Sequence, residues 1–402
     1  MMDLRVLTRV VNSGGRVVTS AVRLDADTLI EEARRQARLD DFGEPAIDEP
    51  LRRLIYSYEH EAELTLIGRI AARQDTLRLL GNRLKMQADR RRHPEIGAVE
   101  IRRPLFVTGL PRTGTTLLHG LLAQDPATRV PYNWESMFPS PPPDRARHRT
   151  DPRIGWAERQ IRWFHRLNPE FRKIHALGAR LPEECLIITS HSFLSFQFQT
   201  GHRVPSYQTW LEAQDLRPGY AAHRRFLQHL QWRCPAARWV LKAPAHLYGI
   251  RALLQTYPDA GIILTHRDPL EVVPSMASLH ATLRSTFSDT IDPQETGAEA
   301  TRRWAEGIAR ALRERDAGAV PAERFLDVMY ADLVRDPIEA VRRVYRHFDL
   351  PFTAAFETRM RRFLSENPKD KHGQHQYTLD QFGLDRDEER ERYRAYRERF
   401  GL

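Results

Sequence analysis

Two glycines and two threonines follow a short apolar run near the first quarter of the chain. The run is Leu105–Val107, and the pattern after it is Gly109, four residues, then Gly114, Thr115 and Thr116. The run predicts a buried strand, and the leucines after the threonines have helical spacing. A strand, a glycine turn and a helix start form a cradle for an anion, because the first amides of a helix have no partner within it.

The cradle differs from a nucleoside triphosphate site in one residue. Thr115 stands where the phosphate-loop pattern carries the lysine that reaches the β- and γ-phosphates. The cation within the turn is Arg112, two residues before Gly114. We therefore expect the turn to hold an anionic group in a different way from an ATPase. A tight turn without a ligand is the alternative.

Three further apolar segments predict strands that end in polar residues. They are 238–242, 261–265 and 324–330, and the polar residues at or just after their ends are Lys242, Arg267 and Tyr330. Helical segments of 10 to 15 residues alternate with these strands, which is typical of a parallel sheet. Ligands bind beyond the carboxyl ends of such strands. The predicted fold class is α/β, a P-loop-type three-layer sandwich with a central parallel sheet and an added N-terminal helical cap.

The predicted organisation has three parts: a helical cap over residues 1–95, the α/β domain over 96–380, and a charged C-terminal helix over 381–402. The first part shows helical spacing, and Asp25 is placed to cap its first helix. The last part is dense in charge, so a solvated helix is expected there.

The composition narrows the class of ligand. The net charge is +9, and the excess comes mainly from arginine. No nucleic-acid-binding motif is present, so an anionic small molecule is expected rather than nucleic acid. The two cysteines fit a reducing compartment, and a cytoplasmic protein without a transmembrane segment is expected. No metal motif appears, and no pattern indicates an oligomeric state.

Three blocks of the sequence resemble one family. GLPRTGTTLLHGLL is similar to the 5′-phosphosulfate loop of sulfotransferases that use 3′-phosphoadenosine 5′-phosphosulfate (PAPS), ILTHRDPLEVVPSMASL is similar to their 3′-phosphate block, and VMYADLVRDP is similar to a third stretch. The arginine in the loop and the LKAPAHL segment resemble the tyrosylprotein sulfotransferases and a bacterial group. The resemblance implies transfer of a sulfuryl group from PAPS to a hydroxyl or amine of a small-molecule, glycan or lipid-type acceptor, without a metal.

The resemblance also implies roles for particular residues. The donor-binding residues it implies are Arg112, Thr113, Gly114, Thr115, Thr116, Arg267, Ser275, Tyr330 and Lys371. Arg112 and Lys242 would act on the transferred group and the leaving oxygen, whereas Arg267 and Ser275 would hold the 3′-phosphate. Lys371 lies in a loose match, KHGQH, to a basic loop of the family.

A general base must take the proton of the acceptor. The related enzymes carry a glutamate in the loop after the first helix, and Glu135, in a predicted loop over 132–144, is our first choice. Desolvation beside Trp134 is expected to raise its pKa. The alternatives are His119, Glu184 and His246; Glu184 lies in a segment, PEEC, predicted to begin a helix at Pro182.

Two other functions remain open from the sequence. A phosphate-loop kinase is one, although the missing lysine and the lack of a clear magnesium-binding aspartate after the segment 261–265 count against it. A non-catalytic protein on the same fold is the other.

Overall fold

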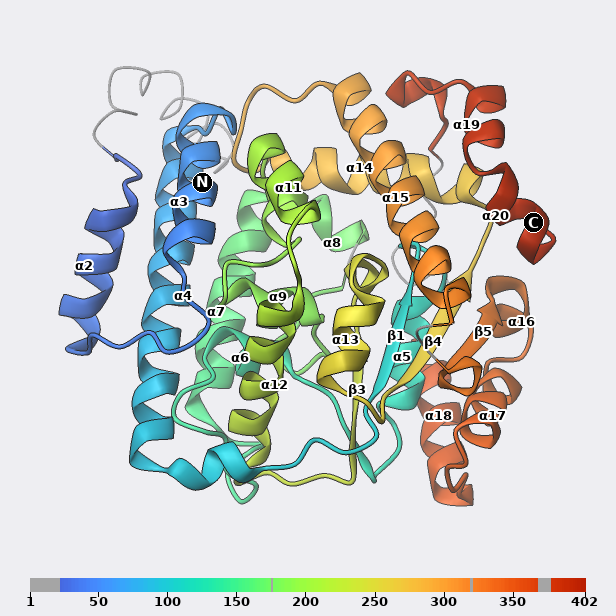
Figure 1. Ribbon diagram of the computed structural model, residues 1–402, viewed down its shortest axis with the longest axis horizontal. Coiled ribbons are helices and arrows are strands. Elements are labelled where there is room, and N and C mark those ends of the chain that lie inside the picture. Colours follow the sequence, from blue (N-terminus) through green and yellow to red (C-terminus); the bar gives the residue numbers. More distant parts are fainter. Residues whose placement is uncertain (1–21, 175, 319–320, 368–376) are drawn as a thin grey trace.

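The computed structural model describes residues 22–174, 176–318, 321–367 and 377–402 (Figure 1). In these ranges five parallel strands form one sheet in the order β2-β3-β1-β4-β5. The strands are β1 (Leu105–Gly109), β2 (Thr128–Arg129), β3 (Arg238–Lys242), β4 (Gly261–His266) and β5 (Phe325–Met329). The four predicted strands are present. The edge strand β2 was not predicted, because two residues are too short to show a period.

The central strand β1 sets the position of the site. Leu105 pairs with Val240 of β3 on one side and with Gly261 of β4 on the other. All three strands are parallel, so their carboxyl ends meet at one edge of the sheet. The glycine turn, Lys242 and Arg267 therefore follow neighbouring strands.

Alternate residues of β1 face two different helical layers. Leu105 and Val107 belong to a core shared with α5 (Thr115–Leu122), α17 (Pro337–His347) and α18 (Ala354–Glu366). Phe106 belongs to a larger core with α12 (Arg217–Gln231), α13 (Ile250–Thr256) and α15 (Pro293–Asp316). This alternation confirms the predicted α/β sandwich of three layers.

The N-terminal helices join the larger core. They are α2 (Ala26–Ala37), α3 (Asp48–His60) and α4 (Leu66–Arg92), at the left of Figure 1. Asp25 caps α2 by accepting a hydrogen bond from Thr28 N at 2.9 Å, as predicted. Leu51 and Leu80 are fully buried in the same cluster as Tyr248 near the sheet. The cap helices thus pack directly onto the α/β region.

The C-terminal segment forms two short helices, not the single solvated helix that the charge pattern predicted. They are α19 (Arg386–Arg392) and α20 (Arg394–Phe400), separated by Tyr393. The Tyr393 side chain is buried, and its hydroxyl donates to Thr301 O at 3.0 Å. Anchoring of this tyrosine against α15 holds the segment on the domain.

The remaining elements connect these layers. They are η2 (Pro94–Ala98), α6 (Asn133–Met137), α7 (Pro152–Leu167), α8 (Phe171–Ile174), α9 (Cys185–Ser190), α10 (Phe198–Gly201), α11 (Pro205–Glu212), η3 (Pro244–Tyr248), α14 (Pro269–Arg284), η4 (Ala322–Arg324), α16 (Tyr330–Arg335) and η5 (Asp380–Phe382). Among the described helices, none carries an apolar stretch long enough to span a bilayer.

Candidate active site

The turn between β1 and α5 depends on its two glycines. Gly109 and Gly114 have φ values of 138° and 87°, a region that disfavours other residues. A Cβ at Gly109 would lie 2.4 Å from Thr265 O, and one at Gly114 would lie 2.7 Å from the Leu333 side chain. Neither position has room for a side chain. The turn is therefore fixed against β4 and α16.

The threonines of the turn have different surroundings. The Thr113 hydroxyl is fully buried; it donates to Leu110 O at 2.5 Å and lies 2.6 Å from Thr265 Oγ1. Thr115 is buried and Thr116 is exposed at the start of α5. The first helical bond runs from Leu118 N to Gly114 O at 3.0 Å. The amides before Leu118 thus lie outside the ladder of α5 and are placed to bind an anion.

The structure brings Arg112 and Arg267 together. Arg267 Nη1 donates to the carbonyl oxygen of Arg112 at 3.1 Å. The Arg267 guanidinium also pairs with Glu271 at 2.7 Å and lies 4.3 Å from the centroid of the Tyr330 ring. Arg112 itself has a φ of 64°. The Arg267 side chain therefore contacts the backbone of the turn, 155 residues away in sequence.

Ser275 lies on α14, the helix that follows Arg267. Asp268 caps α14 by accepting from Leu270 N at 3.0 Å. The Ser275 side chain is at the limit of burial, with 9% of its surface exposed. Lys371, the last predicted donor-binding residue, lies outside the described residues.

Lys242, Glu184 and Thr116 form a second polar cluster at the carboxyl end of β3. Lys242 is 3% exposed, and its Nζ forms an ion pair with Glu184 and lies 3.4 Å from Thr116 Oγ1. Glu184 is the N-cap of α9, so α9 begins at Cys185 and not at Pro182 as predicted. Pro182 instead forms an isolated bridge with Tyr132. A buried ammonium and a carboxylate that keeps 20% exposure thus lie at the start of α5.

Glu135 is placed differently from the prediction. It lies in α6, within the segment predicted as a loop, and its side chain is fully buried. It pairs with Arg129, lies 2.9 Å from His148 Nε2 and accepts from Tyr132 N at 3.0 Å. Burial alone would raise the pKa of Glu135, but the charge of Arg129 and the hydrogen bonds from His148 and Tyr132 N outweigh burial and lower it. The predicted rise in its pKa is therefore wrong, because the arginine was not visible as a partner in the sequence.

The two histidine alternatives are both buried. His119 Nε2 donates to Val240 O at 3.2 Å, with the tautomer inferred from that contact, and burial lowers the pKa of His119 to about 3. His246 Nδ1 lies 2.8 Å from the Tyr220 hydroxyl, and burial lowers the pKa of His246 well below its ordinary value. Among the described residues, none donates to or accepts from His246 Nε2, which is buried.

The comparisons with known proteins settle the family. Residues 104–354, which contain the turn, Glu135, Glu184, Lys242, Arg267 and Tyr330, match the model of the sulfotransferase family. The chain belongs to this family. It is a sulfotransferase, with an α/β domain of the type that the sequence predicted.

Individual relatives agree with that assignment. The chain is 34% identical to the sulfotransferase STF1 of Mycobacterium tuberculosis H37Rv, with a TM-score of 0.83 over 93% of this chain and 99% of that structure. It is 31% identical to STF9 of Mycobacterium avium, with a TM-score of 0.85 over 94% and 97%. It is 28% identical over 299 residues to the omega-hydroxy-beta-dihydromenaquinone-9 sulfotransferase Stf3 of Mycobacterium bovis, covering 69% of this chain and 71% of that protein.

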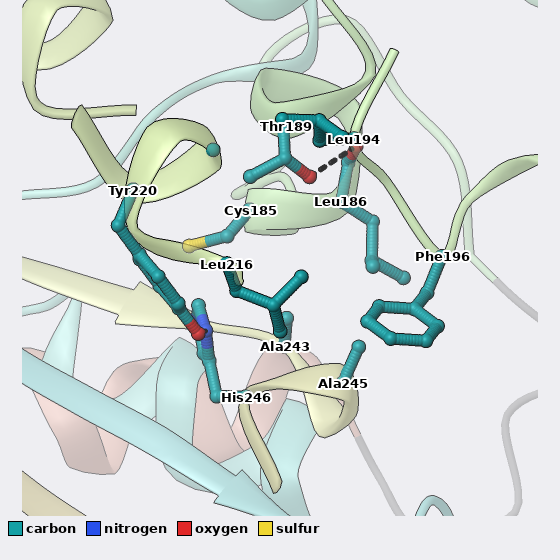
Figure 2. A pocket seen from close by; sticks show the side chains of 11 residues that line it. Cys185, Leu186, Thr189, Leu194, Phe196, Leu216, Tyr220, Ala243, Ala245 and His246 are labelled. Atoms are coloured by element: carbon teal, nitrogen blue, oxygen red, sulfur yellow. Dashed lines mark hydrogen bonds between the residues drawn. The ribbon is translucent and has the colours of Figure 1, made fainter. Parts of the chain in front are cut away.

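This sulfotransferase has a mostly apolar hollow next to the Lys242 cluster (Figure 2). Its walls come from α9 and the loop after it, α12 and the segment after β3, and the polar side chains that Figure 2 shows among them include Cys185, Thr189, Tyr220 and His246. Cys185 follows Glu184 directly, and Ala243 of the wall follows Lys242. Sequence reasoning missed this hollow, because its lining is drawn from segments that share no motif.

Proposed function

We propose that this sulfotransferase transfers a sulfuryl group from PAPS to a hydroxyl group of an apolar, lipid-type acceptor. The observation that carries the proposal is the hydrogen bond from Arg267 to the carbonyl of Arg112. It joins the two segments that would hold opposite ends of a doubly phosphorylated adenosine. A ligand with phosphates at both ends fits this arrangement better than a nucleoside triphosphate.

The donor end suits PAPS in its chemistry. The amides of Thr115 and Thr116 lie outside the ladder of α5 and are suited to an anionic 5′ group. Arg267 and Ser275 would hold the 3′-phosphate by charge-assisted hydrogen bonds, with Tyr330 beside the nucleoside. Lys371 stays in the proposal as a further contact to that phosphate. The donor brings an activated sulfuryl group and a good leaving group.

The acceptor end combines the hollow with the Lys242 cluster. The mostly apolar walls of the hollow suit contact with part of a hydrophobic alcohol. The Mycobacterium bovis relative is named for a menaquinone derivative with an omega-hydroxyl group, which is such a molecule. We therefore expect the acceptor chain to lie in the hollow and its hydroxyl to face Glu184.

We assign the general base to Glu184 in place of Glu135. A base must reach the acceptor, and Glu184 keeps 20% exposure beside Lys242 whereas Glu135 is fully buried between Arg129 and His148. In the transfer, the acceptor oxygen forms a bond to sulfur as its proton passes to Glu184. The bond from sulfur to the bridging oxygen breaks, and that oxygen keeps the electron pair. Lys242 and Arg112 stabilise its negative charge.

Calorimetry with two nucleotides tests the donor assignment. We expect adenosine 3′,5′-bisphosphate to bind more tightly than ATP with magnesium, because the 3′-phosphate meets Arg267. Tighter binding of ATP with magnesium would favour the kinase alternative. Transfer of ³⁵S from labelled PAPS to a long-chain alcohol then tests the activity and the acceptor class together.

The two free cysteines, both buried, agree with a cytoplasmic setting, which we also propose.

A further inference from the structure

The outer face of α7 carries an unusual pair of side chains. Trp156 and Trp163 are 45% and 57% exposed, and both belong to the small group of large apolar side chains that the described surface leaves exposed. They lie seven positions apart, which places them on one line along the helix. Trp163 has the Arg166 guanidinium 5.4 Å from its ring centroid. Scattered exposed apolar residues are ordinary, but two aligned tryptophans are not.

Arginines flank this line. Arg159 and Arg166 each lie three positions after a tryptophan, so they are its neighbours on the helix surface. Arg162 directly precedes Trp163 and lies beside this line. All three arginines are exposed. Glu158 is the one acidic residue within the helix. The opposite face of α7 is apolar in the ordinary way: Ile154 and Ala157 are buried in the cluster that contains Trp134 of α6. One face of α7 thus packs against the rest of the protein, whereas the other face is basic and aromatic and lies on the surface.

Helix α7 is connected through α6 to the segment that carries the proposed general base. α7 packs on α6, whose Asn133 N donates to Leu181 O at 3.1 Å. Leu181 is itself 42% exposed and lies three residues before Glu184. Exposed apolar side chains therefore lie on both segments that border α6. A partner that contacts α7 and Leu181 would therefore lie near Glu184, the residue proposed to activate the acceptor.

We propose that the outer face of α7 (Trp156, Arg159, Arg162, Trp163 and Arg166) binds the surface of an anionic lipid bilayer. Tryptophan favours the level of the lipid head groups, where its ring is partly apolar and its N–H stays hydrated. Arginines beside it are attracted to anionic lipids. This combination distinguishes a bilayer from a nucleic-acid duplex, whose phosphates would need the cations but not the exposed indoles. The link to a lipid-type acceptor rests on the proposed function, but binding to the bilayer does not.

Co-sedimentation with vesicles tests the proposal on the full chain. We expect binding to vesicles with about 30% phosphatidylglycerol and weak binding to pure phosphatidylcholine. The Arg159→Gln/Arg166→Gln variant should lower the partition coefficient about thirtyfold, because each arginine near an anionic surface is worth about fivefold. The Trp156→Ser/Trp163→Ser variant should lower it on both vesicle types. Arg35→Gln/Arg359→Gln removes the same charge from exposed sites on α2 and α18 and should change it little.

Each outcome bears on the proposal. Equal loss in the two arginine variants would mean that only net charge matters, and the proposal would be overturned. Binding that survives both α7 variants would overturn it as well, as would an absence of binding in the wild-type chain. All replaced side chains are exposed, and circular dichroism checks that the variants fold. Binding of adenosine 3′,5′-bisphosphate, measured on the same samples, separates a failure here from a failure of the proposed donor site.

Discussion

The two ends of the proposed site are built in different ways. The donor end is made of a glycine turn and two cations that follow adjacent strands, with Arg112 and Thr116 exposed and Thr113 and Thr115 buried. The acceptor end is made of buried charges, Lys242 with Glu184 and, further away, Arg129 with Glu135. The difference teaches that the exposure of a carboxylate and its partners together decide its role. Glu184 forms an ion pair with Lys242 at the end of β3, next to the start of α5. Glu135, in the capping box of α6, instead accepts hydrogen bonds from three donors.

The first prediction contrasts Glu184 with its neighbour. Glu184→Gln should lower kcat by about 10²–10⁴-fold, because the acceptor proton loses its carrier. Binding of adenosine 3′,5′-bisphosphate should stay near the wild-type value. Glu183→Gln is the matched control: burial raises the pKa of Glu183, which accepts from Asn133 Nδ2 at 2.5 Å, and its amide variant should retain most activity. A large loss in the control alone would transfer the base to Glu183.

Glu135→Gln should affect stability rather than transfer. Removing one partner of a buried ion pair costs about 3–5 kcal/mol of the free energy of unfolding, because Arg129 keeps its charge. Chemical denaturation measures this loss, and kcat per folded molecule should remain within a few-fold of the wild type. A variant that is stable but inactive would return the catalytic role to Glu135.

The pH dependence of stability follows from the same carboxylate. The pKa of Glu135 is lowered in the folded state, so the unfolded chain binds the proton more readily. The stabilisation from Glu135 is therefore complete above the ordinary value of 4.5 and is lost as the pH falls below it. Wild-type stability should drop more steeply below that pH than the stability of Glu135→Gln. Parallel curves would show that the ion pair is not coupled to folding.

At the donor end, Arg267→Ala should weaken binding of adenosine 3′,5′-bisphosphate by roughly 1.5–3 kcal/mol, the scale of a charged hydrogen bond. Calorimetry measures the change directly. Arg335→Ala on α16 removes an exposed arginine of the same charge, with its side chain 77% exposed, and should leave the affinity unchanged. An equal loss in both variants would reduce the effect to general electrostatics.

The smallest effect is expected at Tyr330. Its ring lies 4.3 Å from the Arg267 guanidinium, and loss of such a contact costs about 0.5–1 kcal/mol at a partly exposed site. Tyr330→Leu should therefore reduce affinity for adenosine 3′,5′-bisphosphate only a few-fold, and Tyr330→Phe should restore it because the ring remains. If Tyr330→Phe is as weak as Tyr330→Leu, the hydroxyl and not the ring contacts the ligand.

The parts of the molecule that could be predicted are those whose structure depends on residues close together in the sequence. The turn from Gly109 to Thr116 could be found because backbone conformation and helix ends leave short, fixed spacings. The surroundings of Glu135 could not, since His148 is separated from it by an intervening segment and Arg129 lies on a strand of two residues. The pairing of Lys242 with Glu184 joins segments 58 residues apart, and no local pattern encodes it. The sequence therefore allowed Glu184 as one alternative for the general base, but no local pattern favoured it over Glu135.

The left-handed backbone at Arg112 has a consequence for how the enzyme can be changed. Its φ of 64° suits glycine, whereas the proposed chemistry needs a cation at this position. No single amino acid satisfies both demands. Arg112→Gly should therefore melt at a higher temperature than Arg112→Ala, although both lack the guanidinium. Laboratory selection for thermostability alone would drive this position toward an inactive protein.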